Sequence, residues 1–267
     1  MYIRKKEEKV RRQEILKLYS KFINKGDLCF DIGANIGTRI DAFIALGAIS
    51  VAVEPQPSCV KHLQAKYKKN RRVTICPKAV GDKEGGAQLM LCRENGSMST
   101  LSKEWLEAER PSGRLANYHW DKSITVPVTT LGKLLEQYGI PVFCKIDVEG
   151  YEFNVLNGLF VPIETISFEY HPSIIGEAIN CVKHLSSIGT YYFNYTICES
   201  MCLTLEKWVT PDQMCGILES LPLRPGYGDV YATTSPELFT PSNPKSKLTS
   251  LFYLIRINSK SRQASSL

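Results

Sequence analysis

The stretch LCFDIGANIGT (residues 28–38) decides how the rest of the sequence is interpreted. Its first five residues are apolar apart from Asp31, which predicts a short strand with a carboxylate near its end. Gly33 and Gly37 then predict a tight turn, and the run 36–46 predicts a helix. In an open α/β sheet, ligands bind outside the carboxyl ends of the strands. We therefore expect a ligand site at this glycine turn.

Composition places the chain among ordinary globular proteins. It has 267 residues, of which 43% are hydrophobic and 22% charged. No apolar run approaches the roughly 20 residues needed to cross a bilayer, and the N-terminus is too charged for a secretory signal. The nine cysteines form no CxxC pair and no zinc-type cluster with histidine, which fits a reducing compartment. These features predict a cytoplasmic protein without a transmembrane segment.

Basic charge is concentrated at the two ends of the sequence. Residues 1–25 carry a formal +6 and residues 245–267 carry +5, so the total of +6 leaves the middle at −5. Proteins that bind nucleic acid usually carry a basic surface on the folded body, so we expect no nucleic-acid partner. The basic tails could make weak contact with a membrane surface, although solvated charge explains them more simply.

Strand and helix patterns alternate after the glycine turn. Four further strands are predicted by apolar, β-branched runs: SVAVEP (50–55), RVTICP (72–77), VFCKIDVEG (142–150) and ETISFEYH (164–171). Helical segments between them predict a parallel sheet with helices on both faces. TYYFNY (190–195) and DVYATT (229–234) predict a late pair of strands at one edge.

The chain divides into three parts. A basic amphipathic helix occupies residues 1–25, an α/β domain residues 26–234, and a basic Pro/Ser/Lys-rich tail residues 235–267. Within the domain, the polar insert 94–122 predicts a lid, because long inserts often cover active sites. In the tail, LTSLFYLIRI (248–257) fits either a surface helix or an added strand.

Residues at the glycine turn discriminate between nucleotide-like ligands. A phosphate-binding loop needs a lysine followed by Ser or Thr after its last glycine, but Gly37 is followed by Thr38 and Arg39. A dinucleotide turn needs a second glycine where this chain has Asn35, and Asp31 would repel a pyrophosphate. Asp31 suits a ligand that carries an ammonium group, such as S-adenosylmethionine.

Carboxylates after the next two strands extend this predicted nucleoside site. Glu54 could accept hydrogen bonds from both ribose hydroxyls, and a solvated strand-end acid is the alternative. Asp82, in KAVGD (78–82), could accept a hydrogen bond from the adenine amino group. A tight turn at Gly81 explains that motif equally well.

Together these segments resemble the FkbM-type S-adenosylmethionine-dependent methyltransferases. FDIGANIGT, VAVEP, KAVGD, NGSMST, VTTL and KIDVEGYE occur in this order between Gly26 and Thr234. The resemblance implies an α/β class I (Rossmann-like) methyltransferase fold, with a seven-stranded, mostly parallel sheet, helices on both faces and an antiparallel last strand. It also implies S-adenosyl-L-methionine as methyl donor and a hydroxyl group of a sugar, glycan or natural product as acceptor.

The resemblance also implies a set of cofactor contacts. These residues are Asp31, Gly33, Ala34, Asn35, Gly37, Glu54, Asp82, Ser97 and Asp147. Within this set, the glycine turn would hold the methionine end and Glu54 the ribose. Ser97, with Ser99, would lie in a loop that closes over the site.

An alcohol acceptor would also need a general base, because its oxygen is a weak nucleophile. Asp147 and Glu149 are candidates at the end of the strand 142–150, and Glu169 and His171 at the end of the next. A structural histidine before a proline is the alternative for His171. These four side chains could also hold a divalent ion, but no ligand spacing supports one and we predict no metal.

Three other functions remain as alternatives. A macromolecular (RNA or protein) methyltransferase is supported only by the basic N-terminal helix, and the Asn/Asp-Pro-Pro-aromatic run of base-methylating enzymes is missing. A nicotinamide oxidoreductase is disfavoured by Asp31. A non-enzymatic binding module is disfavoured by the acids at two strand ends. The sequence identifies neither the acceptor nor the oligomeric state.

Overall fold

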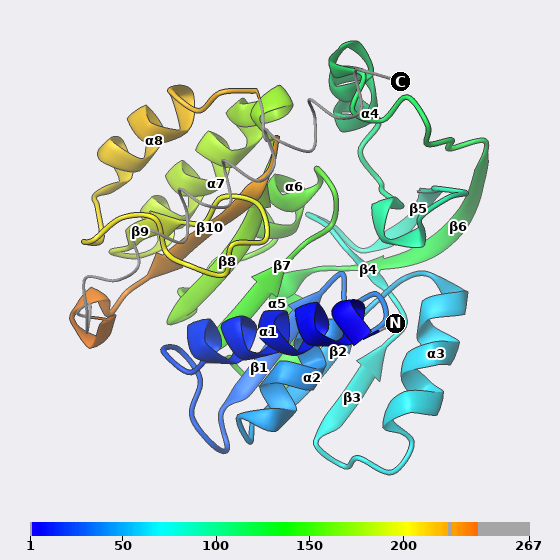
Figure 1. The fold of residues 1–267 in the computed structure, drawn as a ribbon, viewed down its shortest axis with the longest axis horizontal. Coiled ribbons are helices and arrows are strands. Elements are labelled where there is room, and N and C mark those ends of the chain that lie inside the picture. The colour runs from blue at the N-terminus through cyan, green and yellow to red at the C-terminus, as the bar shows by residue number, and fades with distance from the viewer. Residues whose placement is uncertain (1, 224–225, 240–267) are drawn as a thin grey trace.

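The computed structural model describes residues 2–223 and 226–239 and centres on a seven-stranded sheet (Figure 1). In spatial order its strands are β3 (Val73–Cys76), β2 (Ile49–Val53), β1 (Leu28–Ile32), β7 (Phe143–Ile146), β8 (Thr165–Tyr170), β10 (Gly228–Thr233) and β9 (Tyr192–Tyr195). The first five are paired in parallel, whereas β10 runs antiparallel to both β8 and β9. This topology confirms the predicted fold class.

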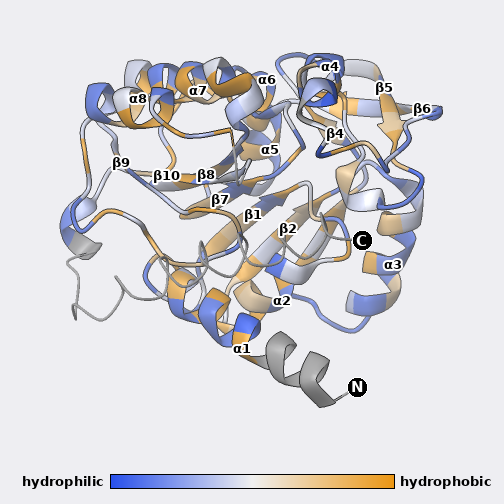
Figure 2. Ribbon diagram, turned by 45° about the horizontal axis from the view of Figure 1, so that its top comes forward, coloured by the Kyte–Doolittle hydropathy of each residue, from blue (hydrophilic) through white to orange (hydrophobic). Residues whose placement is uncertain are grey.

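Helices cover both faces of the sheet (Figure 2). One face packs against α5 (Leu131–Tyr138), α6 (Glu152–Leu156), α7 (Ile175–Ile188) and α8 (Pro211–Glu219). The other face packs against α1 (Tyr2–Tyr19), α2 (Thr38–Ala45) and α3 (Pro57–Tyr67). Two hydrophobic cores result, because alternate residues of a buried strand point to opposite faces. In β1, Phe30 belongs to the first core and Cys29 to the second.

The second half of α1 belongs to the second core. Ile15, Leu18 and Tyr19 are buried, and Phe22, just after the helix, stacks on both Phe143 and Tyr231. Aromatic stacking adds to the free energy gained from burial alone. The predicted N-terminal helix is therefore present, and its last turns are fastened to the centre of the sheet.

A small second sheet lies beside the first, in the order β4 (Ala79–Val80), β6 (Lys122–Thr129), β5 (Gly85–Leu91). Its strands β5 and β6 pair antiparallel, a pairing that the sequence patterns did not reveal. Between them, the polar insert folds into 3-10 turns and the short helix α4 (Lys103–Glu109). The insert is thus structured, and Trp105 of α4 is fully buried.

Two sequence expectations concern membranes and the tail. Among residues 2–223 and 226–239, no helix has the length and apolar character required to cross a bilayer. The tail contributes only a short 3-10 turn, Pro236–Phe239, to the described part of the chain. The segment 248–257, predicted as helix or strand, lies outside the described residues.

Candidate active site

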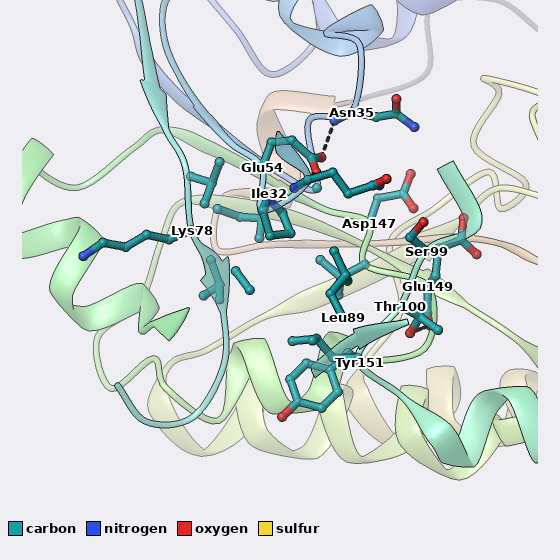
Figure 3. Close-up of a pocket in the computed structure, with 18 of the residues that line it drawn as sticks. Ile32, Asn35, Glu54, Lys78, Leu89, Ser99, Thr100, Asp147, Glu149 and Tyr151 are labelled. Atoms are coloured by element: carbon teal, nitrogen blue, oxygen red, sulfur yellow. Dashed lines mark hydrogen bonds between the residues drawn. The ribbon is translucent and has the colours of Figure 1, made fainter. Parts of the chain in front are cut away.

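A pocket of about 520 Å³, partly open to solvent, lies at the carboxyl ends of β1, β2 and β7 (Figure 3). Among the residues that line it are Gly33, Asn35, Glu54, Ser97, Asp147 and Glu149. The structure therefore brings together half of the residues predicted for the site.

Gly33 allows the ends of β1 and β7 to approach closely. Its φ is 85°, and a Cβ atom there would lie 1.8 Å from the carbonyl oxygen of Asp147. The Asp147 amide in turn donates a 2.9 Å hydrogen bond to the carbonyl of Ile32. Only glycine combines a positive φ with such a close backbone contact at low cost.

Gly37 and Ala34 close the turn from outside the pocket. The Gly37 carbonyl accepts a hydrogen bond from the Tyr67 hydroxyl at 2.8 Å, and its Cβ would lie 2.6 Å from that oxygen. Gly37 has a φ of 80° and is the N-cap residue of α2, which begins at Thr38. Ala34 is buried and accepts from the Gly37 amide. Cofactor contacts by these two residues stay predictions.

Glu54 fastens the glycine turn to the end of β2. Its Oε2 accepts from the Asn35 amide at 2.8 Å and its Oε1 from the Gln56 amide at 2.7 Å (Figure 3). Burial raises the pKa of Glu54, and these two hydrogen bonds oppose the shift. Each carboxylate oxygen keeps a second lone pair that could accept a ribose hydroxyl.

Asp31 lies in β1 behind the pocket wall rather than in the lining. It is 1% exposed, and among the described residues its Oδ2 has no hydrogen-bond partner. Burial raises the pKa of Asp31 to about 7, even though Lys145 and Arg39 oppose this shift. Its predicted contact with an ammonium group stays a prediction.

Lys145 sets the charge of Asp147 at the end of β7. This lysine is 1% exposed, and its Nζ lies 2.9 Å from Asp147 Oδ2 and 3.2 Å from Asp229 Oδ1. Burial alone would raise the pKa of Asp147, but Lys145, with Arg39 and His171, lowers it below its ordinary value. Asp147 is therefore a carboxylate at neutral pH, suited to binding a cation rather than accepting a proton. Our sequence analysis overlooked Lys145, although residues two apart in a strand share a face.

Glu149, two residues after Asp147, has its pKa shifted in the opposite direction. Burial raises its pKa well above the ordinary value, and the Glu169 and Asp147 carboxylates add to the shift. Its φ of 57° is left-handed, and its carbonyl accepts from Thr100 Oγ1 at 2.7 Å. Gly150 follows, with φ at 87° and no room for a Cβ beside Trp105. Backbone strain at functional residues is common.

Glu169 and His171 lie behind Glu149, at the end of β8. His171 is 2% exposed, and its Nε2 lies 3.1 Å from Glu169 Oε2. Burial raises the pKa of Glu169 to about 7 despite this imidazole. For His171, burial lowers the pKa but the Glu169 carboxylate outweighs it. We call Glu149, Glu169 and His171 the His171 cluster.

The remaining predicted residues separate into two groups. Ser97 and Ser99 line the pocket, and the Gln56 side chain holds their loop through a 2.7 Å hydrogen bond to the Gly96 carbonyl. Asp82 is exposed and lies outside the pocket lining, so its contact with adenine stays a prediction. Gln56 was missed because its role depends on a loop 40 positions away.

The sheet order, the antiparallel β10 and a pocket at the carboxyl ends of β1 and β2 define a class I methyltransferase. Residues 31–189, more than half of the chain, match the family model described as the methyltransferase FkbM domain. The chain therefore belongs to the FkbM methyltransferase family, and it is an S-adenosyl-L-methionine-dependent methyltransferase. This match confirms the resemblance and the cofactor expected from the sequence.

Solved structures of methyltransferases are similar to this chain at low sequence identity. Precorrin-6y C5,15-methyltransferase from Geobacter metallireducens has 12% identity and a TM-score of 0.44, over 84% of this chain and 86% of that one. Fibrillarin from Aeropyrum pernix, with bound S-adenosyl-L-methionine, has 10% identity and a TM-score of 0.41, over 79% and 68%. An S-adenosylmethionine-dependent O-methyltransferase from Thermotoga maritima has 10% identity and a TM-score of 0.38, over 87% of this chain and 66% of that one. No curated protein sequence matches the chain.

Proposed function

We propose that this protein transfers a methyl group from S-adenosyl-L-methionine to a hydroxyl group of a sugar, glycan or other natural product. One observation carries the proposal. The carboxyl groups at the ends of β7 and β8 differ in how readily they bind a proton. The pKa of Asp147 is lowered, and those of Glu149 and Glu169 are raised. Such a separation indicates distinct acid–base roles within one site.

The donor half of the pocket fits the cofactor. Glu54 offers two buried carboxylate oxygens for the ribose, and the ionised Asp147 lies where a cationic methionine end would be stabilised. The close approach of Gly33 to the Asp147 carbonyl keeps the ends of β1 and β7 together beside the pocket. The cofactor supplies an electrophilic methyl group, and these residues hold its two ends.

The acceptor half supplies a base for a weak nucleophile. In the proposed reaction the acceptor oxygen forms a bond to the methyl carbon as the carbon–sulfur bond breaks, and the hydroxyl proton leaves the oxygen. Glu149 lines the pocket and is the first base within reach, with Glu169 and His171 behind it to share the proton. A base whose pKa lies near neutrality is the most effective at physiological pH.

The experiment is a methyl-transfer assay with cofactor that carries a radioactive methyl group. Purified full-length protein is incubated with pools of sugars, glycosides and hydroxylated natural products, and in parallel with amines, total RNA and protein extract. We expect label in hydroxylated small molecules, in a form stable to alkali, as an ether is. Label confined to RNA, protein or amines would contradict the proposal. Asp212→Asn, exposed on α8, is the control for nonspecific effects of removing an acid.

A further inference from the structure

Several buried polar atoms without a hydrogen-bond partner gather beside the pocket. Within the described residues they are Nδ1 and Nε2 of His171, Oε2 of Glu169 and Nε1 of Trp105. The Trp105 ring packs 5.2 Å from the His171 ring, so these atoms belong to one place. Leaving a buried polar atom unpaired costs about 1–3 kcal/mol. A concentration of such atoms therefore indicates a missing ligand.

The contact between Glu169 and His171 does not satisfy these two side chains. Oε2 and Nε2 lie 3.1 Å apart, yet in the described structure neither atom makes a hydrogen bond. Glu149 lies close to both residues. One ligand atom from each of the three residues lies within 4.8 Å of the other two.

This spacing is close to that of ligands around one metal ion. Donor atoms about 2.1 Å from a common ion lie about 3.0 Å apart when adjacent and about 4.2 Å apart when opposite. Small rotations of the carboxylates would bring all three donors into one coordination sphere. His171 is the most buried of the three residues. A polar cavity that held only water would not require a histidine at this position.

The carboxylates around the His171 cluster would also be stabilised by a cation. Besides Glu149 and Glu169, the carboxylates of Asp147 and Glu152 act on the same place. Three cations act on these acids among the described residues, and all are already engaged: Arg39 pairs with Glu199, and the other two are Lys145 and Arg114. Lys145 pairs with Asp147 and Asp229, and Arg114 pairs with Glu109. Water could fill the space, whereas a cation would also relieve the repulsion among these carboxylates.

We propose that Glu149, Glu169 and His171 bind a divalent metal ion of the Mn²⁺ type beside the cofactor pocket. Two carboxylate oxygens and one imidazole nitrogen suit a hard to intermediate first-row ion better than Ca²⁺, which prefers an all-oxygen set. An ion placed between Glu169 Oε2 and His171 Nε2 would give both unpartnered atoms a ligand bond at once. This replaces the expectation of a metal-free site that the sequence alone supported.

Position gives the ion a role in the reaction, and that role rests on the proposed function. Glu149 lines the pocket, so the ion would lie at the pocket edge on the side of the acceptor. There it would bind the acceptor hydroxyl oxygen and make its proton easier to remove. The proton would pass to a carboxylate of the cluster or to solvent. Metal binding itself requires only the three side chains.

The test is a titration of Mn²⁺ into chelator-treated full-length protein, without cofactor, with free Mn²⁺ followed by electron paramagnetic resonance. We expect one ion to bind per chain. Glu149→Gln, Glu169→Gln and His171→Gln should each weaken binding by at least about tenfold, as even outer-shell changes at metal sites do. Asp212→Asn, an exposed acid on α8, should bind as the wild type does.

A second readout does not depend on how well the variants fold. Co²⁺ bound to the wild-type protein should show visible absorption bands from ligation by nitrogen and oxygen. The inference is overturned if the wild type binds no Mn²⁺ up to about 1 mM, the weak limit of biological sites. It is equally overturned if all three cluster variants bind as the wild type does. The methyl-transfer assay with labelled cofactor tests the proposed function separately, so either idea can fail alone.

Discussion

Glu54 at the end of β2 and His171 at the end of β8 are both buried polar side chains on the same edge of one sheet, and their surroundings differ. Both carboxylate oxygens of Glu54 accept backbone hydrogen bonds, from Asn35 and Gln56. Neither ring nitrogen of His171 has a hydrogen-bond partner in the part of the chain that the structure describes. The donor half of the site is therefore complete without a ligand, whereas the acceptor half requires one.

The difference follows from how each half is built. The glycine turn and the end of β2 are neighbours in space and satisfy each other through backbone groups, so the turn is formed by folding itself. The His171 cluster combines two carboxylates, Glu149 after β7 and Glu169 in β8, which folding brings together at a cost. A ligand that neutralises this charge would recover that free energy.

The largest effect on stability is expected at Gly33, where close backbone packing forms the donor half of the site. Gly33→Ala should lower the free energy of unfolding by at least about 3 kcal/mol, because a left-handed residue and an overpacked contact each cost about 1–3 kcal/mol. Gly26→Ala is the matched control, with φ at 95° and, among the described residues, no atom within 4 Å of the added Cβ. Urea unfolding measures both variants. Equal losses would show that the contact with Asp147 is unimportant.

The next effect concerns the acceptor half. Glu169→Gln and His171→Gln should lower turnover by at least about 100-fold, the usual contribution of a general base. Affinity for S-adenosylhomocysteine should stay near the wild-type value, because these side chains lie outside the pocket lining. Steady-state kinetics and calorimetry provide the two readouts. Wild-type turnover in both variants would remove the pair from the chemistry.

A smaller effect is expected at Asp31, where stability should depend on pH. Because the folded-state pKa is raised to about 7, the folded protein holds a proton that the unfolded chain releases above its ordinary pKa of about 4. Stability is thus lost as pH rises through this window. Asp31→Asn removes the penalty and should stabilise the protein by about 1–3 kcal/mol at about pH 8, with little gain at about pH 4. Thermal unfolding at both pH values is the measurement, and an equal gain at both would contradict this explanation.

The smallest effect tests whether Gly37 belongs to the pocket or to helix packing. Tyr67→Phe removes the hydroxyl beside the Gly37 carbonyl and should cost about 1 kcal/mol of stability. Cofactor affinity should not change, because the bond lies between the turn and α3. A clear fall in affinity for S-adenosylhomocysteine would show that the turn transmits strain from α3 to the site.

Sequence patterns predicted the donor half better than the acceptor half, for a physical reason. The glycine turn and Glu54 follow directly from local strand, turn and helix signals at adjacent strands. The pairing of Lys145 with Asp229 joins residues 84 positions apart, and no local pattern contains it. When the pairing of Lys145 is unknown, the sequence predicts two equivalent acids at Asp147 and Glu149. In the structure the pKa of Asp147 is lowered and that of Glu149 is raised.

Burial was the other quantity that local patterns could not supply. Asp31 is 1% exposed beside its sheet neighbour Lys145, and its contact with the cofactor stays a prediction. Trp105, from the polar insert, is fully buried where it packs against Gly150 and His171. The antiparallel pairing of β5 with β6 positions that insert, and strand pairing across an insert has no local signal.

The most direct test of the division between the two halves is a calorimetric titration of S-adenosylhomocysteine into three proteins. The wild type should bind one molecule per chain, and His171→Gln should bind it with similar affinity. Glu54→Ala should lose at least about 100-fold, because it removes a buried acceptor from two backbone amides and from the ribose. Unchanged affinity in Glu54→Ala, or equal losses in both variants, would contradict the account.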